Sequence, residues 1–299
     1  MFETDPPSTA FVIVAFYHFF DFPQFEAMHD PLLERLRTLG IRGSLLISRE
    51  GVNSTLSGTR AAIDAFLGYM RDDVVGAPFA WKESFAPAQP FGRARVRLKR
   101  ETISIGEPVS MQRFGRYVAP ADWNALIGRD DVVVIDARND YEVNLGTFAG
   151  AIDPGIAHFK HLPGWTRDRA SALRGKTIAT FCTGGIRCEK YTSWLIDQGF
   201  EDVHHLKGGI LQYLEDIRPD KSLWRGECFV FDERIAVDHA LRPSATAALC
   251  RHCDHTLTDE DQQSPAYAAG RSCPHCHGRA DDAHDRPKSL RAFPGRTKF

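Results

Sequence analysis

The chain has 299 residues, enough for two or three domains, and its 43% hydrophobic and 25% charged residues are ordinary for a globular protein. A formal net charge of −2 excludes the strongly basic class of nucleic-acid-binding proteins, so contact with a polyanion would need a local patch. The first residues do not form the basic segment of a signal peptide, and no apolar run approaches membrane-spanning length, so we expect a cytoplasmic protein.

Seven cysteines are present, and four of them form two Cys-x-x-Cys pairs. An odd count with this pairing indicates reduced thiols and a metal site rather than the disulfide framework of a secreted protein. The thiols are therefore the first candidates for chemistry.

Residues 1–112 are predicted to form a ferredoxin-like βαββαβ domain. Apolar residues recur at helical spacing before Gly40, and Thr59 can cap a second helix that runs to about residue 70. The segment 49–53 is interpreted as a turn. A tight turn needs residues such as Gly and Asn for its backbone conformation, so their presence here does not indicate a ligand site. The predicted strands cover residues 11–17, 43–48, 54–57, 79–83 and 93–105.

Basic residues alternate with apolar ones in the last of these strands. The period of two places Arg93, Arg95, Arg97 and Lys99 on one face. Such a row suits the neutralisation of phosphates. The alternative is a solvated outer face, or a charged edge that prevents aggregation.

Residues 113–225 are predicted to form an α/β domain with a parallel sheet, because strands alternate with helices. The run 132–137 is apolar apart from Asp136, as expected of a strand covered on both faces. Ligands of such sheets bind at the carboxyl ends of the strands, which is where Cys182 lies. Further strands are expected at 177–181 and 203–206, and helices at 165–173, 190–197 and 211–216.

Cys182 stands where a strand ends and a helix begins. Loop N–H groups and a helix N-terminus favour an anion there, and Arg187 adds a permanent positive charge. The thiol should therefore lose its proton easily, and the thiolate is the nucleophile. A buried core cysteine beside an ordinary tight turn is the alternative. The predicted catalytic residues are Cys182 and Arg187, in a loop formed by Thr183, Gly184, Gly185, Ile186 and Cys188.

Two features of this loop leave alternatives open. Cys188 is either a resolving thiol or a small core residue at the start of the helix. Cysteine phosphatases share the topology but separate Cys and Arg by five residues, whereas four separate Cys182 from Arg187. The shorter loop leaves less room for a tetrahedral anion and accommodates a sulfur atom, so the phosphatase interpretation is set aside.

Residues 226–299 are predicted to form a small module like a zinc ribbon. Cys250-x2-Cys253 and Cys273-x2-Cys276 have the spacing of a closed four-thiolate zinc site, which such a small module would need in order to fold. Disulfide or reduced pairs are the alternative, and a histidine could replace a thiolate: His252, His255, His275 or His277. The basic run 286–299 is interpreted as a disordered or RNA-contacting tail.

Several motifs of the middle module resemble those of rhodanese domains. They are Asp136-Ala137-Arg138, Glu142, the stretch 146–152, the Cys182 loop and the segment 206–209. The resemblance implies that Cys182 carries a persulfide. Thr147 stands where the family usually has His, which is a mild departure.

The whole set of motifs is similar to the rhodanese-type tRNA uridine hydroxylases, over roughly residues 11–240. The matching segments are 50–58, 138–142, 182–190 and 228–234; Ser54 replaces the usual Gly or Ala. The resemblance implies oxygen-dependent hydroxylation of the wobble uridine, at position 34 of tRNA, to 5-hydroxyuridine. It implies O2 as co-substrate and tRNA as partner. If the chain modifies tRNA, we expect the basic row and the zinc module to bind the anticodon arm. The resemblance does not identify the reductant.

The residues themselves indicate a reactive cysteine beside a basic strand, and two roles for Cys182 are open. Its thiolate could add to C6 of uracil and make C5 electron-rich, or an oxidised Cys182 could donate the oxygen. A plain sulfurtransferase, which passes persulfide sulfur to an acceptor, and a non-enzymatic adaptor are the rival functions.

Overall fold

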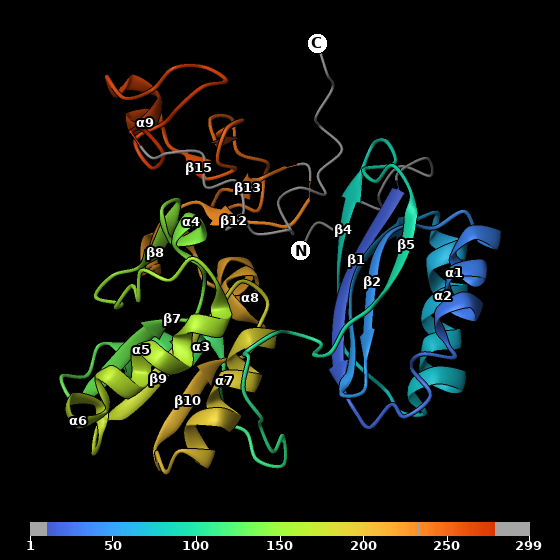
Figure 1. Ribbon diagram of the computed structural model, residues 1–299, viewed down its shortest axis with the longest axis horizontal. Helices are drawn as coiled ribbons and strands as arrows, with labels where there is room; N and C mark the ends of the chain where they lie inside the picture. The colour runs from blue at the N-terminus through green and yellow to red at the C-terminus, as the bar shows by residue number, and fades with distance from the viewer. Residues whose placement is uncertain (1–10, 233, 279–299) are drawn as a thin grey trace. The chain divides into compact units, whose positions relative to one another are not determined.

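The computed structural model describes residues 11–232 and 234–278, so the basic run 286–299 lies outside the described residues. The chain divides into two compact units, with the boundary between Ser104 and Ile105 (Figure 1). Among the helices of the described residues, none has the length and apolar character needed to cross a membrane.

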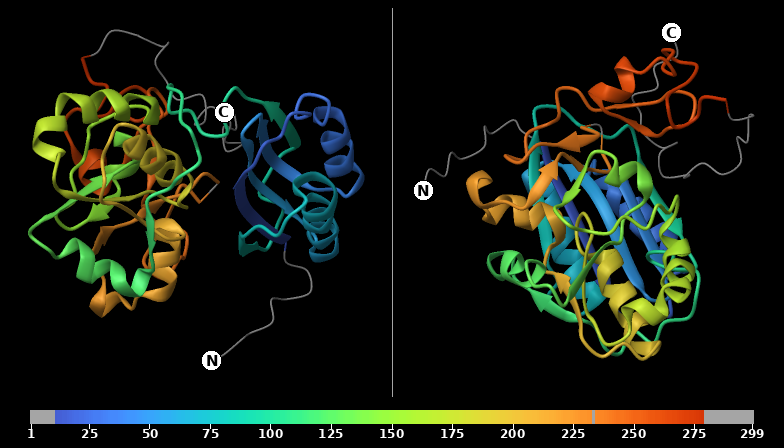
Figure 2. Two further views of the ribbon diagram at one scale, coloured as in Figure 1. Left: turned by 90° about the horizontal axis from the view of Figure 1, so that it is seen from below. Right: turned by 90° about the vertical axis from the view of Figure 1, so that its left-hand side faces the viewer.

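The first unit is a five-stranded sheet with two helices on one of its faces (Figures 1 and 2). The strand order is β4-β1-β3-β2-β5, in which β5 runs parallel to β2 and the other neighbours are antiparallel. This order and the βαββαβ succession confirm the predicted ferredoxin-like topology. The elements are β1 (Phe11–Phe19), α1 (His29–Thr38), β2 (Arg42–Ser48), β3 (Gly51–Gly58), α2 (Arg60–Tyr69), a π-helical segment (Met70–Val75), β4 (Trp81–Ala86) and β5 (Ala94–Leu98).

The core of this unit lies between the sheet and the two helices. Leu32 and Leu36 are one helical turn apart in α1, and both are buried, as is Phe66 in α2. Thr59 caps α2 as predicted, because its side chain accepts a hydrogen bond from the Ala62 N–H at 3.3 Å.

Several strand bounds of the first unit differ from the prediction. Strand β1 continues to Phe19, and β4 covers Trp81–Ala86 rather than 79–83. Strand β3 begins at Gly51, so the turn between β2 and β3 is only the pair Arg49-Glu50. The chain is extended there because Val52 is fully buried in the core. Strand β5 ends at Leu98 rather than at residue 105, because its partner β2 ends at Ser48.

The second unit is built on a four-stranded parallel sheet in the order β6-β10-β9-β7, which confirms the predicted parallel-sheet domain. All five residues of the inner strand β9 are buried. The elements of the sheet and its connections are β6 (Arg116–Val118), α3 (Pro120–Ile127), β7 (Val132–Asp136), α4 (Asp140–Val143), β8 (Gly146–Phe148), α5 (Leu162–Asp168), α6 (Ala170–Leu173), β9 (Thr177–Phe181), α7 (Ile186–Asp197), β10 (Val203–Leu206), α8 (Gly209–Asp216) and β11 (Trp224–Gly226).

Three helices of this unit depart from their predicted bounds. Helix α8 begins at Gly209, two residues before the predicted start. The segment predicted as one helix over 165–173 forms α5 and α6, which are separated at Arg169, where the backbone is not helical. Helix α7 begins at Ile186, four residues before the predicted start, directly after Gly185 at φ 104°. The early start places Arg187 and Cys188 in the first turn of the helix.

The chain then continues within the same unit through short hairpins. Residues 248–278 contain two of these strands, one short helix and the four paired cysteines, and we call them the four-cysteine module. The elements after the sheet domain are β12 (Cys228–Phe229), β13 (Ala236–Val237), β14 (Ala248–Leu249), β15 (Thr256–Leu257) and α9 (Asp259–Gln263).

Candidate functional site

Cys182 follows the last residue of β9 and lies before the N-terminus of α7. Its side chain is fully buried. The Gly185 N–H donates a hydrogen bond to the Cys182 Sγ at 3.1 Å, so the loop backbone turns a donor toward the sulfur. Because Gly185 has φ 104°, a conformation that L side chains rarely adopt, a glycine at this position lets the loop curl.

The surroundings of Cys182 favour its thiolate. Burial alone would raise the pKa of the thiol, but the net pKa falls from 9.0 to about 6. The causes of the lowering are a hydrogen bond from the Cys188 side chain, the positive charge of Arg187 and backbone N–H groups of Cys188 and Gly185. At neutral pH the sulfur is therefore mostly a nucleophilic anion.

Arg187 is held by Glu142, a residue of the short helix α4. The Arg187 Nη1 and Nη2 donate to Glu142 Oε2 and Oε1 at 2.5 and 2.7 Å, and both side chains are buried. The Thr183 hydroxyl donates to Glu142 Oε1 at 3.3 Å. The Arg187 guanidinium therefore forms a bidentate pair with an internal carboxylate, and this pair connects the cysteine loop to α4. The two N–H groups used in the pair are not available to bind a phosphate.

A second buried ion pair fixes the end of the neighbouring strand β7. Arg138 donates to both carboxylate oxygens of Asp136, at 2.6 and 2.9 Å, and to the Gly146 carbonyl at 2.6 Å. The Thr147 hydroxyl donates to Asp136 Oδ2 at 2.8 Å. Thr147, which replaces the usual His of the rhodanese pattern, therefore contributes a hydrogen bond to this network.

Gly209 supports the cysteine loop from the side of α8, a role that the sequence did not reveal. The Ile210 and Leu211 N–H groups donate to the carbonyls of Cys182 and Thr183 at 3.0 and 3.1 Å. A Cβ on Gly209 would lie 2.5 Å from the Cys182 carbonyl oxygen, and the residue has φ +67°. The sequence offers the Gly208-Gly209 pair as a sign of close backbone packing, but it does not show that the cysteine loop is the segment packed against Gly209.

The row of basic residues lies on the edge strand β5 of the first unit. Arg95 and Arg97 occupy alternate positions in β5, Arg93 comes just before the strand, and Lys99 comes just after it. Burial lowers the pKa of Arg95, and the charges of Arg93 and Arg97 lower it further. The positive charges of Arg93 and Arg97 therefore lie close enough to Arg95 to repel its guanidinium.

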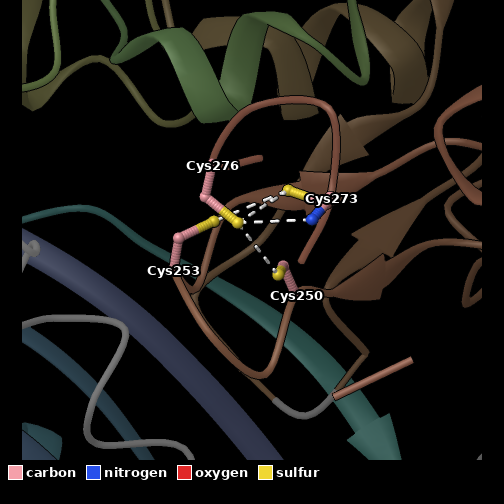
Figure 3. Close-up of side chains that lie close together, drawn as sticks. All are labelled: Cys250, Cys253, Cys273 and Cys276. Carbon is pink, nitrogen blue, oxygen red and sulfur yellow. Dashed lines mark hydrogen bonds between the residues drawn. The ribbon is translucent and has the colours of Figure 1, made fainter. Parts of the chain in front are cut away.

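The four paired cysteines meet in the four-cysteine module (Figure 3). Their sulfur atoms all lie within 4.8 Å of one another, and three of the separations are 3.6, 3.7 and 4.0 Å. A tetrahedral zinc with bonds of about 2.3 Å places its sulfur ligands about 3.8 Å apart. The spacing of Cys250, Cys253, Cys273 and Cys276 therefore fits a metal ion.

Two histidines that could have replaced a thiolate have other partners. The rings of His255 and His275 stack at 3.7 Å. His255 Nδ1 lies 2.9 Å from the Thr256 carbonyl, and His275 Nε2 lies 3.1 Å from Asp261 Oδ1. The metal-binding group found among the described residues consists of the four cysteines.

Comparison with known proteins covers both units. The family described as UPF0176 acylphosphatase-like domain matches residues 11–102, and the rhodanese-like domain family matches residues 119–216. A tRNA uridine(34) hydroxylase of Jannaschia sp. (strain CCS1) is 48% identical over 282 residues, covering 93% of each chain. Proteins of the same name from Albidiferax ferrireducens and Mesorhizobium japonicum are 49% and 47% identical, over 92% and 94% of this chain and 88% and 91% of theirs.

Proposed function

Because the chain belongs to the family of tRNA uridine(34) hydroxylases, we propose that it hydroxylates C5 of the wobble uridine through Cys182, giving 5-hydroxyuridine. The observation that carries the role of Cys182 is its position at the end of β9 with a pKa of about 6. A thiolate that is stable at neutral pH can attack an electrophilic carbon without a separate base.

The chemistry proposed for Cys182 is addition to C6 of uracil. A bond forms between the sulfur and C6, and the electron pair of the C5–C6 double bond moves into an enolate over C5, C4 and O4. The enolate makes C5 nucleophilic, so that C5 can accept oxygen. Loss of the C5 proton and expulsion of the thiolate then restore the double bond and release Cys182 unchanged.

The net replacement of C5–H by C5–OH removes two electrons from the base. With O2 as co-substrate, one oxygen atom enters the product and the other leaves as water. The balance then requires two electrons and two protons from a separate two-electron reductant. Cys182 itself is neither oxidised nor reduced in this scheme.

Arg187 is proposed to act as a positioning residue rather than to touch the base. Its guanidinium is paired with Glu142, yet its charge lowers the pKa of Cys182. The loop residues Thr183, Gly184, Gly185, Ile186 and Cys188 complete the proposed site. Their part is to present backbone N–H groups and one S–H group to the sulfur.

The remaining parts of the proposal concern binding and organisation. The anticodon arm of tRNA would bind at Arg93, Arg95, Arg97 and Lys99, and a structural zinc would bind the four thiolates of the four-cysteine module. A tRNA substrate favours a cytoplasmic location. The division into modules at 1–112, 113–225 and 226–299 stays a prediction.

The decisive experiment compares tRNA nucleosides by mass spectrometry in cells that carry Cys182→Ala or Cys228→Ala in place of the natural chain. Cys228 is a matched control, because it is also fully buried but burial raises its pKa to about 12. We expect 5-hydroxyuridine to disappear with Cys182→Ala and to persist with Cys228→Ala. Undiminished product with Cys182→Ala would refute the proposal.

A sulfurtransferase is the second candidate, since the rhodanese-like match includes the Cys182 loop. The Gly185 N–H, 3.1 Å from the sulfur, could equally stabilise a persulfide on Cys182. Cyanide-dependent release of thiocyanate measures this activity. Rapid turnover by a chain that leaves tRNA unmodified would favour the sulfurtransferase over the hydroxylase.

A further inference from the structure

The sheet of the first unit has one face that is not covered by the helices of that unit. Val14, Leu45, Leu56 and Val96 point toward α1 and α2 and belong to the core. The side chains that alternate with them point to the opposite side, because successive residues of a strand face opposite ways. We call this side the helix-free face.

The composition of the helix-free face is unusual for a solvated surface. Strand positions on this face in β1–β5 hold basic, aromatic, aliphatic and small polar residues, but no Asp or Glu among the described strands. The rings of Tyr17 and Phe19, two residues apart on β1, meet edge to face at 6.1 Å. A surface with this charge and these rings is complementary to a polyanion that carries planar groups.

Strand register places these groups in one row across the sheet. Tyr17 on β1 is opposite Asn53 on β3, Asn53 is opposite Leu46 on β2, and Leu46 is opposite Arg97 on β5. At about 4.8 Å between neighbouring strands, Tyr17 and Arg97 are separated by about 14 Å. The Asn53 amide has no hydrogen-bond partner among the described residues, so its donor and acceptor are available to a ligand.

The arginines in and next to β5 have no counter-charge among the described residues of the first unit. Among residues 11–104, no carboxylate forms an ion pair with Arg93, Arg95 or Arg97. The Arg95 Nε is buried and has no hydrogen-bond partner. A buried donor without a partner is costly, so a rotation of the Arg95 side chain that brings this donor to a phosphate oxygen is favoured.

We propose that the helix-free face binds single-stranded RNA, with a base stacked on Tyr17, its edge met by Asn53 and its phosphates held by Arg95 and Arg97. Aromatic side chains can stack only on unpaired bases, and RNA-recognition domains use the open face of a small sheet in this way. The choice of an anticodon loop as the RNA rests on the proposed function. Protection of an edge strand explains charges on β5, but not Tyr17 and Asn53 on the inner strands.

The test measures the binding of a fluorescent anticodon stem-loop RNA to the full-length chain by anisotropy. Tyr17→Leu keeps an apolar side chain of similar reach without the ring, and Tyr17→Phe keeps the ring. We expect Tyr17→Leu to weaken binding roughly 5- to 100-fold, and Tyr17→Phe to bind like the natural chain. A duplex without a loop should compete poorly with the stem-loop.

The phosphate contacts are tested by salt dependence. The double variant Arg95→Gln and Arg97→Gln should reduce the slope of log affinity against log salt by about 1.4, since each lost phosphate contact on a single strand contributes about 0.7. Arg37→Gln removes a charge from α1, on the other side of the sheet, and should leave the slope almost unchanged. Circular dichroism and a thermal melt establish that each variant is folded.

Three outcomes separate the two proposals. Natural affinity and slope in folded Tyr17→Leu and in the arginine double variant would overturn the RNA platform, even where the natural chain hydroxylates tRNA. If the duplex bound as tightly as the stem-loop RNA, the helix-free face would recognise the backbone of double-stranded RNA. This result would overturn the assignment of single-stranded RNA. Loss of binding in these variants, in a chain that never modifies tRNA, would support the platform and refute the hydroxylase.

Discussion

Replacing Cys188 tests how the site makes Cys182 reactive. Cys188 lies in the first turn of α7 and is fully buried. Burial raises the pKa of Cys188 well above its usual value, and the hydrogen bond to Cys182 raises it further. Cys188 therefore keeps its proton and donates an S–H hydrogen bond to the Cys182 thiolate. Cys188→Ala removes this donor and leaves the backbone N–H groups in place.

The size of the effect follows from the hydrogen bond that is lost. A hydrogen bond to a charged group contributes about 1.5–3 kcal/mol, and a thiol is a weak donor, so about 1.4 kcal/mol, or one pKa unit, is expected. The pKa of Cys182 should rise from about 6 to about 7. The thiolate fraction at pH 6 should then fall from about one half to about one tenth.

The assay alkylates the chain with iodoacetamide between about pH 5 and pH 9 and quantifies the labelled Cys182 peptide by mass spectrometry. Labelling at pH 6 should slow about fivefold in Cys188→Ala, while labelling at pH 9 stays close to that of the natural chain. Cys188→Ser retains a donor and should restore a pKa near 6. An identical titration midpoint in Cys188→Ala and the natural chain would refute this account of the lowered pKa.

Three further predictions concern the support of the site. Gly209→Ala should lower the free energy of unfolding in urea by roughly 2 kcal/mol, because the added Cβ would clash with the Cys182 carbonyl oxygen. The control is Gly68→Ala in α2, where an added Cβ would meet no atom within 4 Å, so no destabilisation is expected. Removing the metal from the four-cysteine module with a chelator should release about one zinc per chain and lower the melting temperature; an unchanged melt would contradict a structural metal. Burial lowers the pKa of His205 from 6.5 to about 4, so between pH 7 and pH 5 the unfolded chain binds more protons than the folded chain and stability falls as the pH drops. This group should cost about 2 kcal/mol of unfolding free energy between pH 7 and pH 5. Urea unfolding at both pH values should show that His205→Phe abolishes this loss.

The parts of the fold that the sequence predicted are those with local signals. Strand β7 is indicated by a run that is apolar apart from Asp136, and the first unit by the alternation of strand and helix patterns. The start of α7 was missed because Arg187, a charged residue, gives no sign of burial. Its partner Glu142 lies 45 residues away, and only the folded chain brings the two together.

The same limit applies to the candidate site. Cys182 could be identified from its place between a strand and a helix, because that signal lies within ten residues. The donors that lower its pKa belong to the loop itself, but the contacts that hold the loop come from α4 and α8. Such long-range support depends on tertiary packing, which no periodicity in one segment can report.

A continuous path of contacts links the four-cysteine module to the cysteine loop. The Thr256 hydroxyl donates to the Tyr141 carbonyl, and the Asn144 amide donates to the Thr256 carbonyl at 3.3 Å, so β15 holds both ends of α4. Helix α4 carries Glu142, which in turn pairs with Arg187 beside Cys182.

A helix of four residues cannot hold its own position, because it makes too few internal hydrogen bonds. A metal in the four-cysteine module would therefore act on the reactive sulfur at a distance, by fixing the carboxylate that orients Arg187. The metal-depleted chain should show a higher pKa for Cys182 in the same alkylation assay as Cys188→Ala. A lower melting temperature with an unchanged Cys182 titration would show instead that the module stabilises the fold without tuning the thiol.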